Sequence, residues 1–207
     1  MTRPILILIG GGSGAGKTVI AEHLAATLGH HASAVVPIDA YYHNHPLATR
    51  ETRAALNYDS PDAFDGSLLN THIRELLAGH VVSRPIYDYR THCRLSNTIR
   101  ISAEEYLIVE GVLALHWLSL RELCDIAVFV TTNDALSLAR RIKRDVNERG
   151  RSKASVRAQW KQTVRPMYIA HVEPTRQYAH IVIDGADSIK TSVGTLLRHI
   201  HTGAIRL

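Results

Sequence analysis

Five short runs of apolar residues recur along the chain, and longer stretches with helical spacing of apolar residues follow most of them. The apolar runs cover residues 4–9, 34–38, 106–109, 126–130 and 181–183. Runs of this length without polar alternation are typical of strands buried on both faces of a parallel sheet. Helical spacing is found over residues 19–28, 68–77, 135–148, 152–172 and 189–201. This rhythm predicts an α/β fold of three layers, in which helices cover both faces of a five-stranded, mostly parallel sheet.

The segment 81–101 breaks this rhythm. Apolar and polar residues alternate over 84–89 and again over 98–101, which predicts two antiparallel strands joined by a polar turn. We interpret this β-hairpin as a lobe inserted beside the functional site. Rings and polar side chains that suit a planar heterocycle are found on Tyr87, Asp88, Tyr89 and His92. The alternative interpretation is an aromatic pair across a half-buried sheet.

Length and composition are those of one globular domain, which we expect to span residues 1–207, with 45% hydrophobic and 21% charged residues. The two cysteines, Cys93 and Cys124, lack the spacing of a metal site and indicate reduced thiols in the cytoplasm. The first apolar run leads directly into a glycine-rich loop, so we expect no signal peptide, and no run reaches transmembrane length. The 13 histidines lack paired cysteine or acidic ligands and are interpreted as surface residues.

A glycine-rich segment follows the first predicted strand and matches the phosphate-binding pattern G-x-x-x-x-G-K-[ST], the P-loop. It consists of Gly11, Gly12, Ser13, Gly14, Ala15, Gly16, Lys17 and Thr18. Glycines let backbone N–H groups approach a polyphosphate, and the N-terminus of the following helix adds positive potential. Lys17 would reach the outer phosphates, and the Thr18 hydroxyl would bind Mg²⁺. An accidental glycine turn would not have both flanks correct, so we predict a nucleoside triphosphate site.

Carboxylates follow two of the predicted strands. Asp39 comes after the second apolar run, and Glu110 ends the third. Because the carboxyl ends of parallel strands share one edge of the sheet, both side chains are expected near the bound phosphates. Glu110 suits a magnesium ligand, directly or through water, whereas Asp39 taken alone could equally be a turn residue. Asp65 can cap the helix that follows it, a role that does not explain Asp59.

Basic residues concentrate in one segment, which we expect to form a helical lid over residues 138–157. The formal net charge of the chain is +5, and this segment contains Arg140, Arg141, Lys143, Arg144, Arg149, Arg151 and Lys153. Arginines spaced by three and four residues share a helix face and repel one another unless they meet an anion. With Gly150 as a hinge, we predict a mobile lid that closes arginines over phosphates. A solvated helix paired through Asp145 and Glu148 is the alternative.

Several separated motifs resemble those of the uridine–cytidine kinases, a family of P-loop kinases, and the resemblance covers most of the chain. Beside the P-loop, the matching parts are 39–42, 57–65, 85–89, His92, Arg94, 109–113, 140–151, Gln159 and 163–167. The Asn-Tyr-Asp-x-Pro block, the spacing from Tyr87 to His92 and the Arg-rich segment are more specific than the P-loop, which very many proteins share. The resemblance implies a P-loop kinase fold and transfer of phosphate from ATP or GTP, with Mg²⁺, to the 5′-hydroxyl of uridine or cytidine.

The resemblance also implies roles for individual residues. Asp39 corresponds to the catalytic base that accepts the proton of the 5′-hydroxyl. The nucleoside-binding positions correspond to Tyr42, Asp59, Tyr87, His92, Arg141 and Gln159. The positions near the phosphates correspond to Lys17 and to the lid residues Arg144, Arg149 and Arg151. The magnesium positions correspond to Thr18 and Glu110.

Two residues depart from the family pattern on the side of the donor nucleotide. Thr131 stands where an aspartate is common, and Ser137 stands where some members have an arginine; the choice between ATP and GTP therefore stays open. The alternatives are a related P-loop kinase for nicotinamide riboside, pantothenate or ribulose phosphate, or a nucleotide-dependent switch protein that binds RNA. From the resemblance we expect small-molecule substrates, no nucleic acid or membrane partner, a cytoplasmic location and a homo-oligomer such as a tetramer.

Overall fold

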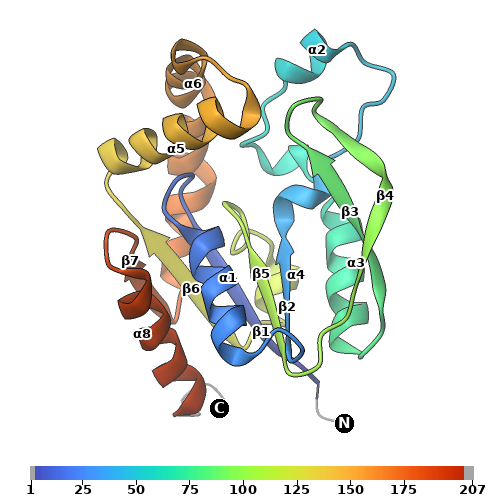
Figure 1. The fold of residues 1–207 in the computed structure, drawn as a ribbon, viewed down its shortest axis with the longest axis vertical. Helices are drawn as coiled ribbons and strands as arrows, with labels where there is room; N and C mark the ends of the chain where they lie inside the picture. Colours follow the sequence, from blue (N-terminus) through green and yellow to red (C-terminus); the bar gives the residue numbers. More distant parts are fainter. Residues whose placement is uncertain (1–2, 203–207) are drawn as a thin grey trace.

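The computed structural model describes residues 3–202, and its centre is a parallel sheet of five strands in the order β2-β5-β1-β6-β7 (Figure 1). The strands are β1 (Ile5–Gly11), β2 (Ser33–Pro37), β5 (Tyr106–Glu110), β6 (Ile126–Thr131) and β7 (Ile181–Asp184). Every neighbouring pair is parallel. The fold class predicted from the five apolar runs is therefore confirmed.

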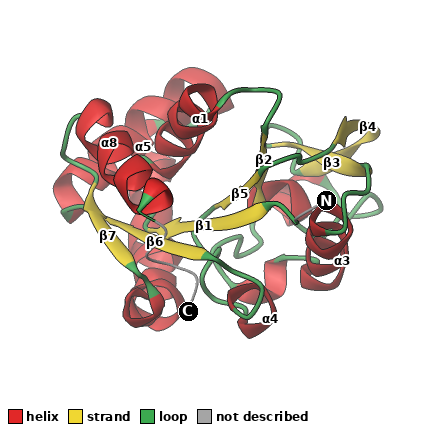
Figure 2. Cartoon of the chain, turned by 90° about the horizontal axis from the view of Figure 1, so that it is seen from below, coloured by secondary structure: helices red, strands yellow, loops and turns green. Residues whose placement is uncertain are grey.

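Side chains of the sheet point alternately into two hydrophobic cores, one on each face. Ile7 of β1 faces the core closed by α1 (Lys17–Leu28) and α8 (Ile189–His201), whereas Leu8 faces the core closed by α3 (Gly66–Leu77). Figure 2 shows α1 and α8 on one side of the sheet and α3 on the other. Because successive residues of a strand face opposite sides, burial on both faces requires an unbroken apolar run.

The segment 152–172 is helical as predicted, but its hydrogen bonding changes along its length. Its α-helical parts are α6 (Lys153–Gln159) and α7 (Arg165–Met167), and π-helical turns follow at Trp160–Val164 and Tyr168–Val172. Pro166 has no N–H to donate, and in a regular α-helix its ring would clash with the carbonyl of the residue four positions earlier, so regular α-helical hydrogen bonding is interrupted there. An uninterrupted α-helix is therefore the wrong description of this segment.

The remaining helices are short apart from α5, the helix that carries most of the arginines. They are α2 (Arg50–Ala54), α4 (Leu118–Arg121), α5 (Asp134–Arg149) and 3₁₀ turns at Ile38–Tyr41, Pro61–Ala63 and Glu173–Tyr178. Asp65 caps α3 as predicted, since its Oδ1 accepts a hydrogen bond from the Leu68 N–H at 3.0 Å. No helix within residues 3–202 is both long and apolar enough to cross a membrane.

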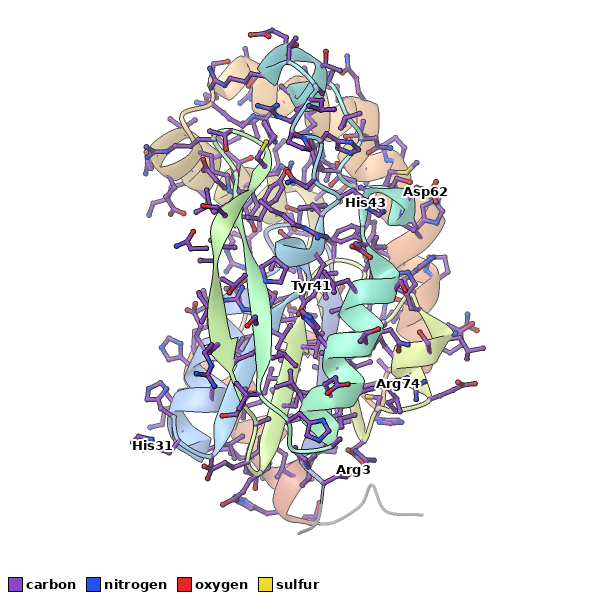
Figure 3. All side chains as sticks on the ribbon, turned by 90° about the vertical axis from the view of Figure 1, so that its right-hand side faces the viewer. Arg3, His31, Tyr41, His43, Asp62 and Arg74 are labelled. Carbon is purple, nitrogen blue, oxygen red and sulfur yellow. The ribbon has the colours of Figure 1, made fainter. Side chains whose placement is uncertain are left out.

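Strands β3 (Val82–Asp88) and β4 (Cys93–Ile101) form the predicted antiparallel hairpin beside the main sheet. β4 begins five residues before the expected 98, because residues 93–97 do not sustain an alternation of apolar and polar side chains, and Leu95, Ser96 and Asn97 are all exposed. Figure 3 shows Tyr41 between the hairpin and α3, where its hydroxyl lies 3.0 Å from Nδ1 of His72. Arg94 of β4 donates hydrogen bonds to the carbonyls of Tyr42 at 2.8 Å and Tyr41 at 3.1 Å, which attach the hairpin to the segment that follows β2.

Candidate active site

The phosphate loop joins β1 to α1 and packs closely against neighbouring backbone. A Cβ atom on Gly11 would lie 2.1 Å from the carbonyl oxygen of Val130, and one on Gly14 would lie 2.4 Å from that of Ser137. Both glycines also have positive φ angles, of 135° and 80°. Side chains are therefore excluded at these positions by clash and by backbone strain. The loop presents its backbone at the N-terminus of α1, where phosphate binding is favoured.

The carboxyl ends of three adjacent strands bring the phosphate loop and two carboxylates together. Thr18 Oγ1 donates a hydrogen bond to Glu110 Oε1 at 3.1 Å, and Lys17 Nζ donates one to the Gly12 carbonyl at 2.8 Å. Burial lowers the pKa of Lys17, while the charges of Glu110 and Asp39 oppose this shift. Burial raises the pKa of Glu110 from 4.5 to about 7, opposed by Lys17 and reinforced by Asp39. Asp39 and Glu110 therefore act on the same lysine.

Thr18 and Glu110 offer two hard oxygen ligands beside the phosphate loop, and they fit Mg²⁺. This ion is usually held by one or two carboxylates together with substrate phosphates and water. Among the side chains of residues 3–202, no group of three or more His, Cys, Asp or Glu could hold a metal ion, so phosphate oxygens would complete the coordination. A cation here would also stabilise the ionised form of Glu110, which burial disfavours.

We expect the Glu110 carboxyl to make the nucleotide-free protein less stable as the pH rises. Its pKa in the folded protein, about 7, lies above the usual 4.5, so the folded state binds the proton more tightly than the unfolded state. The contribution of protonated Glu110 to the stability of the folded protein is complete below the pKa that this group has in the unfolded chain, and it is lost as the pH rises through 7. Its size is about 3 kcal/mol.

Chemical denaturation of the wild type and of Glu110→Gln between pH 5 and 8 measures this effect. The free energy of unfolding of the wild type should fall relative to that of the variant, in which the titrating group is absent. A difference between the two proteins that stays constant over this range would contradict the expectation.

Four rings form one wall of the site, between the hairpin and the segment after β2. The ring centroids of Tyr42 and Tyr87, both buried, are 5.0 Å apart, and Tyr58 stacks on His92 at 5.1 Å with 15° between the ring planes. Burial, followed by the charge of Arg151, lowers the pKa of His92. A neutral imidazole offers one hydrogen-bond donor and one acceptor. This aromatic wall can therefore hold a planar ring and pair with its polar edge.

A cluster of polar side chains lies between the segment after β2 and α6. Asp59 Oδ2 accepts a hydrogen bond from Thr163 Oγ1 at 2.9 Å, and Gln159 Oε1 accepts one from Arg141 Nη2 at 2.8 Å. Arg151 Nη1 also donates to Gln159 Oε1. Burial raises the pKa of Asp59, and the charge of Arg141 opposes the shift. Asp59, Arg141 and Gln159, which were predicted as site residues from distant segments of the sequence, thus lie together in an arrangement that can bind hydroxyl groups.

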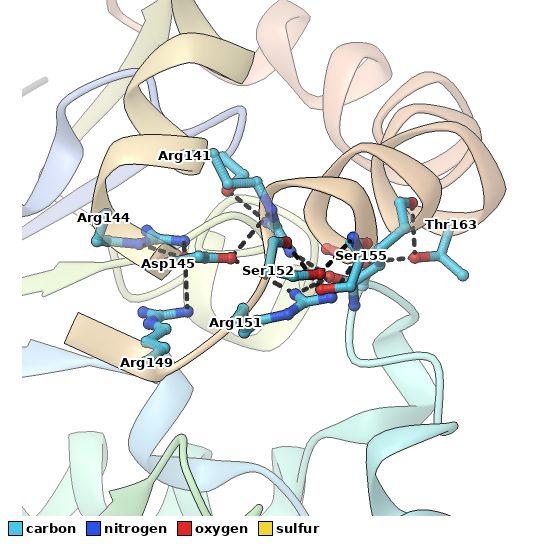
Figure 4. A network of polar contacts seen from close by, with 11 residues as sticks. Arg141, Arg144, Asp145, Arg149, Arg151, Ser152, Ser155 and Thr163 are labelled. Carbon is cyan, nitrogen blue, oxygen red and sulfur yellow. Dashed lines mark hydrogen bonds and ion pairs between the residues drawn. The ribbon is translucent and has the colours of Figure 1, made fainter. Parts of the chain in front are cut away.

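One fully buried carboxylate, Asp145, pairs with four arginines of α5 and of the loop that follows it (Figure 4). Its oxygens lie 2.8 Å from Arg144, 3.5 Å from Arg151, 3.6 Å from Arg141 and 3.7 Å from Arg149. We call these four arginines the arginine cluster. Pairing with Asp145, which the sequence suggested as a mark of a solvated helix, occurs instead at a buried position. Four guanidinium groups against one carboxylate leave the cluster positive and suited to phosphate.

One continuous pocket of about 880 Å³ joins the phosphate loop, the aromatic wall and the arginine cluster. The predicted site residues that line it are Ser13, Gly14, Ala15, Gly16, Lys17, Thr18, Asp39, Tyr42, Asp59, Tyr87, His92, Glu110, Arg141, Arg144, Arg149, Arg151 and Gln159. Gly11 packs beneath the loop against β6, and Gly12 lines a smaller neighbouring cavity. The phosphate loop at one end and the aromatic wall at the other, in a pocket of this size, suit two small-molecule substrates.

The structure adds residues to which the sequence assigned no site role. Tyr58 and Asp145 line the pocket, and Thr163 donates to Asp59. Tyr89, which was expected beside a planar heterocycle, also lines the pocket. Tyr58 and Thr163 lie within the family-like segments, which is the signal that could have identified them. Asp145 also lies within a family-like segment, 140–151, but its burial could not be predicted, because an acidic residue among arginines on a helix has the same pattern at an exposed surface.

The fold and the pocket define a protein of the P-loop phosphotransferase class, with a triphosphate loop at the carboxyl edge of a parallel sheet and an acceptor site beside it. The sequence model of the protein family described as "Phosphoribulokinase / Uridine kinase family" matches residues 6–192, and the chain belongs to this family.

A relative and two solved structures agree with this membership. A protein named uridine kinase from Streptococcus thermophilus (strain ATCC BAA-491 / LMD-9) is 42% identical over 202 residues, which cover 94% of this chain and 96% of the relative. The structure of a putative fructose transport system kinase from Silicibacter sp. TM1040 has a TM-score of 0.70 at 20% identity, covering 88% of this chain and 90% of that one. That of a possible uridine kinase from Bacillus stearothermophilus has a TM-score of 0.55 at 22% identity, covering 89% and 90%. At these identities the two structures show a shared fold.

Proposed function

We propose that this protein transfers the γ-phosphoryl group of ATP or GTP, with Mg²⁺, to the 5′-hydroxyl of uridine or cytidine. The observation that carries the proposal is one pocket that contains both the phosphate loop and the aromatic wall. Asp39 lines this pocket together with Lys17 of the loop and Tyr42 of the wall, so its carboxylate lies between the two ends. The name of the 42% identical relative supports the same acceptor. The products, UMP and CMP, belong to pyrimidine salvage.

Phosphoryl transfer leaves little covalent chemistry to protein groups, so positioning and charge stabilisation dominate. Asp39 Oδ1 is buried and has no hydrogen-bond partner among residues 3–202, and it would accept the 5′-hydroxyl proton as that oxygen attacks the γ-phosphorus. Lys17 and Arg144 would stabilise negative charge on the transferring group. When bound by Thr18 and Glu110, Mg²⁺ would neutralise charge on the phosphate oxygens.

The acceptor would lie across the aromatic wall and the polar cluster. Its base would contact Tyr42, Tyr87 and His92, and its ribose hydroxyls would contact Asp59, Arg141 and Gln159. Arg149 and Arg151 would close over the phosphates from the lid, residues 138–157.

A panel of acceptors scored for phosphorylated product tests the proposal. Uridine, cytidine, adenosine, nicotinamide riboside, pantothenate and ribulose phosphate are each supplied with ATP or GTP. We expect UMP and CMP as the main products. Phosphorylation of another acceptor alone would overturn the substrate assignment within the same class of enzyme. Salt-sensitive RNA binding without turnover would instead favour a nucleotide-dependent switch.

Replacing His92 by alanine is expected to weaken discrimination between pyrimidine and purine nucleosides. The variant loses both hydrogen-bonding atoms of the ring and the stacking with Tyr58, so we expect the ratio of kcat/KM for uridine to that for adenosine to fall about tenfold. His80→Ala is the matched control, since His80 is exposed and pairs with Glu75 at the end of α3. Selectivity that survives in His92→Ala would show that the hairpin does not select the base.

A further inference from the structure

Tyr89 lies between the proposed base and the arginine cluster and contacts both. Its hydroxyl donates a hydrogen bond to Asp39 Oδ2 at 2.9 Å, and the guanidinium carbon of Arg149 lies 3.5 Å from the centroid of its ring. We propose that Tyr89 is a positioning residue that fixes the orientation of the Asp39 carboxylate and connects it to the lid. The inference rests on the proposed role of Asp39 as the base.

The hydrogen bond matters because it distinguishes the two oxygens of Asp39. Oδ2 accepts from Tyr89, whereas Oδ1 is buried and finds no hydrogen-bond partner in the part of the chain that the structure describes. A carboxylate held through one oxygen cannot rotate freely about its last side-chain bond, so its free oxygen points in a defined direction. Proton transfer requires hydrogen-bond distance and alignment with the attacking hydroxyl. A fixed Oδ1 meets this requirement before the acceptor binds.

The position of Tyr89 is itself determined by the turn of the hairpin. Asp88 accepts hydrogen bonds from the Arg90 N–H at 2.9 Å and from Thr91 Oγ1 at 2.7 Å, and its carbonyl accepts from the His92 N–H at 2.8 Å. The Tyr89 ring packs edge-on against Tyr87, with centroids 5.4 Å apart. Burial and the charge of Asp39 raise the pKa of Tyr89, so its hydroxyl remains a proton donor at neutral pH.

One face of the Tyr89 ring is in contact with Arg149 of the lid. Arg149 both stacks on this ring and lies 3.7 Å from Asp145, and Arg90 Nε donates to the Glu148 carbonyl at 3.2 Å. A cation over an aromatic face is attracted to it. The end of α5 and the turn of the hairpin therefore meet at Tyr89, and displacement of the lid would change the surroundings of Asp39.

Tyr89→Phe removes the hydroxyl and keeps the ring. We expect kcat to fall about tenfold, with the KM values for uridine and ATP within about twofold of the wild type, because orientation of the base affects the chemical step and not binding. Tyr178→Phe is the matched control, because its ring also carries a stacked arginine, Arg121, at 4.0 Å, but lies outside the pocket. Its activity should be unchanged.

Tyr89→Leu and Arg149→Met test the connection to the lid. Tyr89→Leu should lower kcat further than Tyr89→Phe in the wild-type background, and the two should be equal in the Arg149→Met background, since the stacking is already absent. If Tyr89→Leu lowers kcat below that of Tyr89→Phe by the same factor in the wild-type and Arg149→Met backgrounds, the connection to the lid is overturned. Thermal unfolding of each variant establishes that it is folded.

Asp39→Asn, measured in parallel, separates this inference from the role on which it rests. An inactive Asp39→Asn together with Tyr89→Phe within twofold of the wild-type kcat would overturn the role of Tyr89 and leave the base in place. An active Asp39→Asn would overturn both. A rise in KM at unchanged kcat in Tyr89→Phe would show a binding role and would also overturn the inference.

Discussion

Asp39→Asn is expected to lower the turnover of uridine by a factor of about 10² to 10⁴ while ATP binding is retained. The substitution preserves size, and its amide can still accept the Tyr89 hydrogen bond through oxygen. The NH₂ group then occupies the place of Oδ1, for which the described residues provide no hydrogen-bond partner. An amide nitrogen cannot accept the proton of the attacking hydroxyl. Binding of ATP should change little, because the phosphate loop is unaltered.

Steady-state kinetics and calorimetric titration with Mg²⁺ and ATP separate the two effects. Asp62→Asn is a suitable control, because Asp62 is exposed on a 3₁₀ turn and outside the pocket lining. Turnover by Asp39→Asn at the wild-type rate would exclude Asp39 as the base. Loss of ATP binding in the variant would indicate that Asp39 acts on the donor and not on the acceptor.

Asp145→Asn is expected to lower both stability and activity. The fully buried carboxylate lies within 3.7 Å of four guanidinium groups, and removing its charge leaves like charges close together. Breaking a buried ion pair by removing one partner costs about 3–5 kcal/mol. In a protein of this size a loss of about 3 kcal/mol lowers the melting temperature by roughly 6–12 °C. Displaced arginines should also lower kcat/KM about a hundredfold.

Asp134→Asn provides the comparison on the same helix. Asp134 pairs with Arg165 at an exposed position, where an ion pair contributes about 0–1 kcal/mol. Thermal unfolding of the wild type, Asp145→Asn and Asp134→Asn without nucleotide measures the effect on stability. Kinetics at a temperature where all three are folded then measure the effect on activity. Equal melting temperatures for the two variants would show that Asp145 does not hold the arginine cluster together.

The fold could be predicted from the sequence because burial on both faces leaves a pattern that depends only on neighbouring positions. Apolar runs such as residues 4–9, which contain Ile7 and Leu8, indicated strands, and the stretches between successive runs indicated helices. The π turns on either side of Pro166 could not be predicted, because a change from i→i+4 to i→i+5 hydrogen bonding hardly alters helical periodicity. The early start of β4 was missed for a related reason: an exposed strand carries no alternation.

The site could be predicted as far as strand ends and motifs place its residues. Asp39 and Glu110 were expected at the edge that holds the phosphate loop, because parallel strands end there together. The hydrogen bond from Tyr89 to Asp39 and the ion pairs of Asp145 depend on how the hairpin and α5 approach the sheet. Sequence spacing contains no information on that approach, so these contacts required the structure.

The burial of Asp145 has a thermodynamic consequence for nucleotide recognition. A free arginine side chain carries about 2 kcal/mol of rotamer entropy. In this protein ion pairs with Asp145 hold four such side chains, so much of their disorder is lost when the chain folds. Association with a triphosphate should accordingly have a small unfavourable conformational entropy, and the cost of ordering the phosphate-binding groups falls on folding and not on binding.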